Sequence, residues 1–291
     1  MRWQNADDKL IDMHAHLFAF SEEGGRLLEQ LQNSGCLCTR QELMRCELNY
    51  RKAHGIFTCL SSGTPEEWRE QRHFVGDEVL CSFGIHPWYA DRYQPEEYRE
   101  YFASCDMIGE IGMDSVWCEI PLAVQQKKLE IQLQIAAEMQ KPVVLHTKGQ
   151  EKEIAEMLRG FPCPILVHWY SGDREALERF LDLDCWFTLG PDFSLEQPLY
   201  RYLIKTTGAN RLFLETDGLS AIRWVKNMAE EKQMQEELEK EKRSEESAFF
   251  SDLERVLAGN LEQVAEQKNL PSDAVKKQMA DNLREFIEFN I

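Results

Sequence analysis

Short apolar segments recur along the chain, and each is followed by turn residues and then by a charged amphipathic stretch. Eight such segments occur, at 9–17, 55–63, 78–87, 107–114, 141–149, 163–172, 185–191 and 211–218. The runs VVLH, ILVHW and LFLET are continuous and rich in aliphatic residues, which is typical of strands buried on both faces of a parallel sheet. The pattern therefore predicts eight β-strands.

Helical patterns lie between these segments. Apolar residues recur at i, i+3, i+4 and i+7 in 65–76, 121–141 and 173–183. Strands and helices that alternate eight times are typical of a closed (β/α)8 barrel. A doubly wound open sheet is the alternative, but it normally carries a glycine-rich phosphate loop after its first strand, and this sequence has none. We therefore predict an α/β fold, a TIM barrel that forms a single domain over residues 1–291.

Two regions are longer than a minimal barrel requires. Residues 22–54, between the first and second predicted strands, could form two helices. After the eighth strand, residues 219–250 include the strongly charged run KNMAEEKQMQEELEKEKRSEE. This composition is compatible with an exposed helical or lid-like insertion on the catalytic face and with a disordered segment, and the sequence leaves both open.

Composition narrows the range of functions. The formal charge is -18 and no run is rich in Lys or Arg, so we expect no extended surface for duplex nucleic acid. A nucleic-acid or small phosphoester substrate would be held locally, by metal ions and a few hydrogen-bond donors. The 9 cysteines without a C-x-x-C spacing, and the lack of a signal peptide before the first strand, favour reduced thiols in the cytoplasm. No apolar run is long enough for a membrane span, and the oligomeric state is not indicated.

Metal-ligating residue types gather at the ends of the predicted strands, which is where barrel enzymes build their active sites. Five of the 7 histidines lie there, together with two carboxylates. The residues are His14 and His16 (first strand), His86 (third), Glu110 (fourth), His146 (fifth), His168 (sixth) and Asp217 (eighth). His14 and His16 point to the same face of a strand because they are two residues apart. Glu110 lies inside an apolar strand, where an unpaired carboxylate is costly, so we interpret it as a metal ligand.

The donor types limit the choice of metal. Imidazole nitrogens and carboxylate oxygens without thiolates favour Zn, Mn, Fe, Co or Ni, with Mg possible where oxygen ligands dominate. Six ligands are too many for one tetrahedral ion and fit two divalent ions that share a bridging carboxylate. Two ions about 4 Å apart can support displacement at phosphorus or polarise a carbonyl, and they lower the pKa of a bound water. As alternatives, His146 and His168 could be hydrogen-bonded core residues, and Asp217 could cap a helix.

Several motifs carry a resemblance to a known family. IDMHAHL, SFGIHPW, MIGEIGMD, KPVVLHTKG, VHWYSG and LFLETDG occur in this order over residues 11–218, and ADNLREFIEFN lies near the C-terminus. As an ordered set they resemble the TatD family of metal-dependent hydrolases, in the amidohydrolase-like barrel superfamily. The resemblance implies a TIM barrel with two divalent ions and metal-dependent deoxyribonuclease activity. It also implies a ligand set in which His14, His16 and Asp217 hold the first ion, Glu110 bridges, and His146 and His168 hold the second.

The chain departs from the family pattern on the substrate side. Lys148 stands where many relatives carry an Arg, and a lysine presents a point charge rather than a bidentate fork. Trp169 replaces the usual small residue or Cys after the sixth-strand histidine, and we expect it to narrow the pocket. After ETDG, LSAIRWVKN and the charged insertion replace the proline-rich loop of the family. All three differences fall where a substrate would enter.

The resulting hypothesis is a two-metal hydrolase that cleaves a phosphodiester. The expected catalytic residues are Glu110 and Asp217, with Asp217 acting as both ligand and general base. Candidates for substrate binding are His86, Lys148 and Trp169, although His86 could instead have a structural role before Pro87. Two alternatives stay open. One is a carbonyl hydrolase of the same barrel type that acts on a small amide, ester or lactone, and the other is a metal-loaded protein that binds a partner without catalysis.

Overall fold

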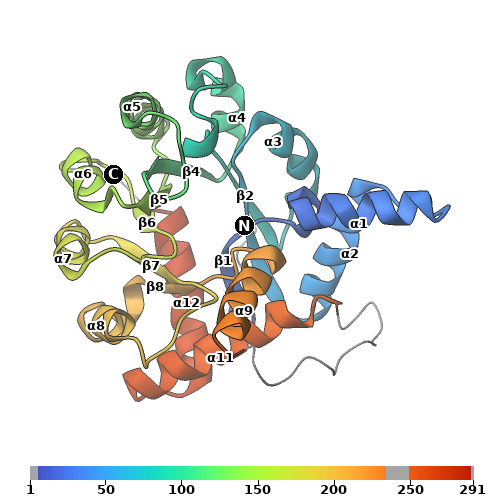
Figure 1. Ribbon diagram of the computed structural model, residues 1–291. Helices are drawn as coiled ribbons and strands as arrows, with labels where there is room; N and C mark the ends of the chain where they lie inside the picture. Colours follow the sequence, from blue (N-terminus) through green and yellow to red (C-terminus); the bar gives the residue numbers. More distant parts are fainter. Residues whose placement is uncertain (1–5, 234–248, 290–291) are drawn as a thin grey trace.

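The computed structural model describes residues 6–233 and 249–289, and its strands close into a barrel (Figure 1). The eight parallel strands pair in chain order, and β8 pairs back to β1. They are Leu10–Ala15 (β1), Ile56–Ser62 (β2), Val79–Phe83 (β3), Met107–Asp114 (β4), Val143–Lys148 (β5), Ile165–Val167 (β6), Trp186–Leu189 (β7) and Leu212–Leu214 (β8). Each strand lies inside the segment predicted for it, so the TIM barrel is confirmed.

Helices follow the strands and surround the barrel. The α-helices outside the two long regions are Pro65–Gln71 (α3), Arg99–Ser104 (α4), Leu122–Met139 (α5), Glu151–Met157 (α6), Arg174–Asp182 (α7), Pro198–Thr206 (α8), Ser251–Lys268 (α11) and Ser272–Ile287 (α12). Short 3₁₀ helices occur at Phe18–Phe20, Arg72–Phe74, Pro87–Tyr89, Pro95–Tyr98 and Ala209–Arg211. The three predicted helical stretches correspond to α3, α5 and α7.

The region between β1 and β2 forms two helices, as its length predicted. These are Glu22–Asn33 (α1) and Arg40–Ala53 (α2). The Ser21 hydroxyl accepts a hydrogen bond from the Gly24 N–H at the start of α1, and Thr39 forms a capping box with Glu42 at the start of α2. Both caps satisfy N–H groups that a helix leaves without internal partners.

The region after β8 begins as a helix, Leu219–Gln233 (α9), which follows the last strand almost directly. In Figure 1, α9 lies near the middle of the view, whereas α5 to α8 lie at its rim. Helix is therefore confirmed for the first part of the predicted insertion. Residues 234–248, which carry most of its charge, lie outside the described residues.

Two observations bear on the composition arguments. Across residues 6–233 and 249–289, no helix has the length and apolar character that a bilayer span requires. All nine cysteines lie within these same ranges, and none of them forms a disulfide bond.

A buried network of ion pairs and hydrogen bonds connects α2 with β1 and with the segment after β8. Arg51 of α2 is 1% exposed, and its guanidinium donates to Asp12 Oδ2 of β1 at 2.6 Å and to Glu47 Oε1 at 3.0 Å. Asp12 also accepts hydrogen bonds from the Thr216 N–H and hydroxyl, at 2.8 and 2.6 Å. In its turn, Glu47 accepts the Phe18 N–H at 2.8 Å. The network therefore joins α2 to the strand of the paired histidines and to the residue before Asp217.

Removal of Arg51 should destabilise the protein strongly, because two buried carboxylates would lose their counter-ion. We expect Arg51→Met to lower the free energy of unfolding by about 3–5 kcal/mol, measured by denaturant titration. The matched control is Arg26→Met, which removes an exposed ion pair with Glu22 and should change the stability by less than about 1 kcal/mol. A loss below about 1 kcal/mol for Arg51→Met would show that the network does not support the fold.

Candidate metal centre

The barrel brings all the predicted ligands together at the carboxyl ends of its strands. His14 lies in β1, Glu110 in β4 and His146 in β5. His168 directly follows β6, and Asp217 follows β8 by three residues. Parallel strands of a barrel all end on the same side, so residues that are 200 positions apart in the chain meet here.

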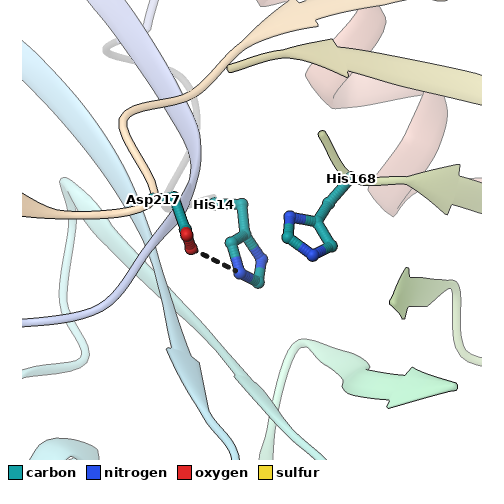
Figure 2. Close-up of side chains that lie close together, drawn as sticks. All are labelled: His14, His168 and Asp217. Atoms are coloured by element: carbon teal, nitrogen blue, oxygen red, sulfur yellow. Dashed lines mark ion pairs between the residues drawn. The ribbon is translucent and has the colours of Figure 1, made fainter. Parts of the chain in front are cut away.

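One oxygen of Glu110 faces the first group of predicted ligands, which consists of His14, His16 and Asp217. Glu110 Oε2 is 3.3 Å from His14 Nε2 and 3.2 Å from His16 Nε2. Asp217 Oδ1 lies on the same side, 3.4 Å from His14 Nε2 and 3.7 Å from His16 Nε2. Figure 2 shows the Asp217 carboxylate directed at His14, whose ring stacks on that of His168 with centroids 4.3 Å apart.

The other oxygen of Glu110 faces the second group. Glu110 Oε1 is 2.6 Å from His146 Nδ1 and 2.7 Å from His168 Nε2. His86 Nε2 also approaches this oxygen, at 3.4 Å, and lies 3.4 Å from His146 Nδ1. The structure thus places His86 beside the ligands of the second group, whereas sequence reasoning left its role between substrate binding and packing.

The electrostatics of the centre favour positive charge between its carboxylates. Burial opposes ionisation of Glu110, but the imidazoles of His168, His86 and His14 outweigh this effect and hold its pKa well below the usual range. Burial likewise opposes protonation of His14, yet the adjacent carboxylates of Asp217 and Glu110 raise its pKa well above normal. A carboxylate that is 2% exposed therefore stays charged and attracts cations.

The donor set fits divalent ions. Three groups of side chains each place three ligand atoms within 4.8 Å of one another: His14, His16 and Glu110; His14, His168 and Asp217; and His86, Glu110 and His146. His14 Nε2 is buried and has no well-directed hydrogen-bond acceptor among the described residues, although two carboxylates lie close to it. Nitrogen and oxygen donors without sulfur suit first-row transition ions or Zn.

Asp114 supports His146 and was not identified from the sequence. Asp114 Oδ2 is 3.0 Å from His146 Nε2 and accepts the Trp88 Nε1–H at 2.7 Å, while its Oδ1 accepts the N–H groups of Val116 and Trp117. Burial opposes ionisation, but these hydrogen bonds lower the pKa of Asp114. A carboxylate on the second nitrogen of a histidine fixes the ring for metal binding. The available signal was its position four residues after Glu110, on the same face of the strand.

Glu215 is a second residue that sequence reasoning missed. Its side chain is fully buried, and neither carboxylate oxygen has a hydrogen-bond partner within the described ranges. Glu215 Oε1 lies 3.6 Å from His168 Nδ1, which is also without a partner there. Glu215 thus lies beside His168 as Asp114 lies beside His146. The motif LFLETDG displayed this glutamate two residues before Asp217.

The three residues predicted for substrate binding, His86, Lys148 and Trp169, line the same cavity as most of the predicted metal ligands. Lys148 and Trp169 border a cavity of about 280 Å³ together with Glu110 and Asp217. The Lys148 ammonium donates to the Trp169 carbonyl at 2.6 Å and to the Ser171 hydroxyl at 3.1 Å. Trp169 forms part of the wall of this cavity, and a narrowing of the pocket by its side chain stays a prediction.

The motifs that the barrel assembles have a counterpart among known proteins. A family model described as TatD related DNase matches residues 11–288, almost the whole chain. The chain belongs to the TatD family. The resemblance that the sequence motifs indicated is therefore confirmed.

Individual TatD relatives are more distant. The chain is 27% identical over 175 residues to YcfH of Escherichia coli K12, named an uncharacterized metal-dependent hydrolase, and the alignment covers 57% of this chain and 66% of YcfH. It is 28% identical over 154 residues to human TATDN2, named a 3'-5' RNA nuclease, over 48% of this chain and 20% of that protein. These alignments span less than two thirds of either relative. The crystal structure of the TatD homologue YjjV from Escherichia coli K12 shares the fold, with a TM-score of 0.64, 18% identity, and coverage of 98% and 100% of the two chains.

The position of Asp217 in this TatD chain depends on the glycine that follows it. Asp217 has a φ of 52° and Gly218 a φ of 88°, both in the left-handed region. A Cβ atom on Gly218 would lie 2.2 Å from the His16 carbonyl oxygen, so any other residue would push the chain apart at the ligands. The Asp217 N–H donates to the His14 carbonyl at 3.1 Å, which fixes the same approach from the other side.

The stability cost of the close contact at Gly218 can be measured separately from the cost of its backbone conformation. Gly35 has nearly the same φ, 86°, but nothing lies within 4 Å of its Cβ position. We expect Gly35→Ala to lower the free energy of unfolding by about 1–2 kcal/mol, the cost of the left-handed conformation alone. Gly218→Ala should cost about 1–3 kcal/mol more, because backbone atoms must also move. Equal losses in denaturant titrations of the two variants would show that the contact with His16 does not constrain the site.

Proposed function

We propose that this TatD-family chain is a hydrolase that uses two divalent ions to cleave phosphodiester bonds in nucleic acid, most simply as a deoxyribonuclease. The observation that carries the proposal is the division of ligands by the two oxygens of Glu110. The family description, TatD related DNase, and the human relative named an RNA nuclease support phosphodiester chemistry.

The ligand assignment follows from the two groups around Glu110. His14, His16 and Asp217 would hold one ion on the Oε2 side, and His146 and His168 would hold the other on the Oε1 side. When bound, such ions polarise the phosphoryl oxygens and lower the pKa of a water ligand toward neutrality. Glu110 belongs to both groups, so the loss of its charge would affect both.

Asp217 is the residue best placed to accept a proton. The side chain of Asp217 is 19% exposed and lines the cavity. The side chain of Glu110 is only 3% exposed and is surrounded by imidazoles. Burial opposes ionisation of Asp217, but the adjacent imidazoles of His14 and His16 lower the pKa of Asp217, which keeps it in the base form. It would take the proton of the attacking water and return it to the leaving oxygen.

Other residues of the chain would orient the predicted ligands or line the cavity in which the substrate would bind. Asp114 fixes the ring of His146, and Glu215 lies against His168. Lys148 is 4% exposed and lines the cavity, so its charge favours an anionic substrate over a neutral one. This charge supports a phosphodiester in preference to a neutral ester or lactone.

Neutral replacements of the two carboxylates test the mechanism. We expect Asp217→Asn and Glu110→Gln to reduce kcat on a single-stranded oligodeoxynucleotide by about 10²–10⁴-fold, because each removes a charged ligand and the first also removes the base. Asp182→Asn, an exposed aspartate on α7, is the matched control and should retain full activity. Wild-type turnover by either site variant, folded and loaded with metal, would refute the mechanism. Hydrolysis of a carbonyl ester panel without nuclease activity would refute the substrate class.

Metal removal should affect stability as well as activity. Dialysis against a chelator should abolish hydrolysis and lower the Tm, because ions that bind only the folded protein stabilise it, by about 2.7 kcal/mol at one hundred times their Kd. Addition of Zn, Mn, Co, Ni, Fe or Mg salts to the dialysed protein should restore both properties for the native metal. In Glu110→Gln the same dialysis should change the Tm by much less. An unchanged Tm and activity in the wild type would exclude a metal-dependent enzyme.

A further inference from the structure

Four tryptophans surround the opening of the candidate metal centre. Trp88 follows β3, Trp117 follows β4, Trp169 follows β6, and Trp224 lies on α9. Together with Lys148 they line a cavity of about 590 Å³, within the size range of small-molecule sites. Trp88, Trp117 and Trp224 are 44%, 54% and 47% exposed, so large apolar surfaces from separate parts of the chain face one volume of solvent. We call this volume the tryptophan cavity.

The Trp224 ring meets the rings of Trp117 and Trp169 edge to face. The Trp224 ring stands nearly perpendicular to Trp117, at 81° with centroids 6.3 Å apart, and to Trp169, at 77° and 6.3 Å. The Lys148 ammonium lies over the faces of both Trp117 and Trp169, 6.0 and 5.5 Å from their centroids. Ring faces therefore border the cavity next to a positive charge.

Trp169 is held in place at some cost to the backbone. Its φ is 37°, which is uncommon for a bulky residue and is maintained only where surrounding contacts enforce it. Its Nε1–H donates to Asp192 Oδ1 at 2.6 Å, and its backbone N–H donates to the Thr188 hydroxyl at 2.9 Å. A Cβ atom on Gly190 would lie 2.6 Å from the indole, so the ring lies flat on that glycine. Strained residues that are fixed in this way cluster at binding sites.

The tryptophan cavity is continuous with the metal centre. Trp88, Trp117, Trp169 and Lys148 border both the tryptophan cavity and the cavity around Glu110, and Asp217 lies where the two meet. Trp88 also donates its Nε1–H to Asp114, the carboxylate that orients His146. A ligand in the tryptophan cavity would therefore be attached to, or adjacent to, the bond that reacts.

We propose that the tryptophan cavity binds an unpaired base of the nucleic acid whose phosphodiester is hydrolysed. This inference rests on the function proposed above and adds a binding subsite to it. Base stacking on aromatic side chains suits every base, because each has a π-face, and it needs no basic surface. A chain of net charge -18 gains little from attraction to the phosphate backbone, so stacking would supply binding energy that charge cannot.

The charge inside the tryptophan cavity distinguishes this ligand from another class. Aromatic cages commonly bind quaternary ammonium groups. Here the ammonium of Lys148 already lies over Trp117 and Trp169, so a second cation would meet a like charge. A neutral flat ring carrying a phosphodiester avoids this repulsion and brings an anion toward Lys148. Only an unpaired base can enter, since both faces of a base inside a duplex are covered by its neighbours.

The first test compares two single-stranded substrates of equal length, an oligomer of deoxyadenosine and an oligomer of abasic residues. Wild-type enzyme should cleave the base-bearing oligomer with a kcat/KM about 10- to 100-fold higher, the range expected from stacking of one base. Trp224→Ala should reduce this ratio about tenfold or more. Met228→Ala is the matched control, because Met228 lies one turn further along α9, is 46% exposed and does not line the tryptophan cavity. Its ratio should equal that of the wild type.

The second test measures binding without turnover. Tryptophan fluorescence of the metal-loaded protein is recorded on addition of deoxyadenosine monophosphate or deoxyribose 5-phosphate. The nucleotide should quench emission at concentrations at least tenfold lower than the sugar phosphate, in the wild type and in Met228→Ala but not in Trp224→Ala. Equal binding of both ligands in the wild type would overturn the inference.

The outcomes separate the subsite from the proposed function. Cleavage of both oligomers with a ratio near one, unchanged in Trp224→Ala, would overturn the base subsite and leave the nuclease function standing. Absence of cleavage in the wild type, with selective quenching by the nucleotide, would overturn the nuclease function and support the base subsite.

Discussion

The carboxylate of Glu110 is a single negative charge that is almost closed off from water and lies within 3.4 Å of five imidazole rings. A charge in such a place must be compensated locally, because solvent cannot do so. The compensation comes from imidazoles at four other strand ends, those of β1, β3, β5 and β6, which the closed barrel brings to one point. The barrel and the candidate metal centre therefore depend on each other, since the strands position the imidazoles and the carboxylate gives them a common partner.

Charges alternate outward from this point. Glu110 lies at the centre with imidazoles around it, and the carboxylates of Asp114 and Glu215 lie beyond His146 and His168. Between α2 and β1, the buried Arg51 neutralises Asp12 and Glu47. The outer carboxylates limit the movement of His146 and His168, as residues behind a metal-binding histidine would. The acidic composition of the chain is thus partly a property of its interior and not only of its surface.

The sequence predicted the parts of the structure that follow from local pattern. Continuous aliphatic runs located the strands, and ligand-type residues at their ends located the centre around Glu110. The supporting contacts could not be predicted in this way. Arg51 reads as an ordinary surface position of an amphipathic helix, and its partner Asp12 lies 39 residues away. Thr216, which completes that network, is 204 residues from Asp12. Pairings over such distances have no period and appear only when the barrel closes.

The side chains that line the tryptophan cavity also could not be predicted from the sequence pattern, for a different reason. Trp88 lies in a three-residue 3₁₀ helix and Trp117 in the loop after β4, segments in which no periodicity predicts the direction of a side chain. Trp169 was noted as an unusual neighbour of His168, but its fixed orientation depends on Asp192 and Gly190 from the loop after β7. Trp224 belongs to a helix whose position on the barrel follows from tertiary packing. The segments after β3, β4 and β6 and the helix α9 must all be in place before these side chains share one space.

One residue, Gly218, lies between Asp217 and Leu219, where α9 begins. The same helix carries Trp224. A displacement of α9 is therefore transmitted through a single peptide unit to the Asp217 carboxylate. By thermodynamic reciprocity, if a cation is held at Asp217 as proposed, a molecule that alters the position of α9 would change the affinity for that cation, and the cation would change the affinity for that molecule by the same factor. Under the proposed function, substrate capture and cofactor retention would in that sense be one coupled equilibrium.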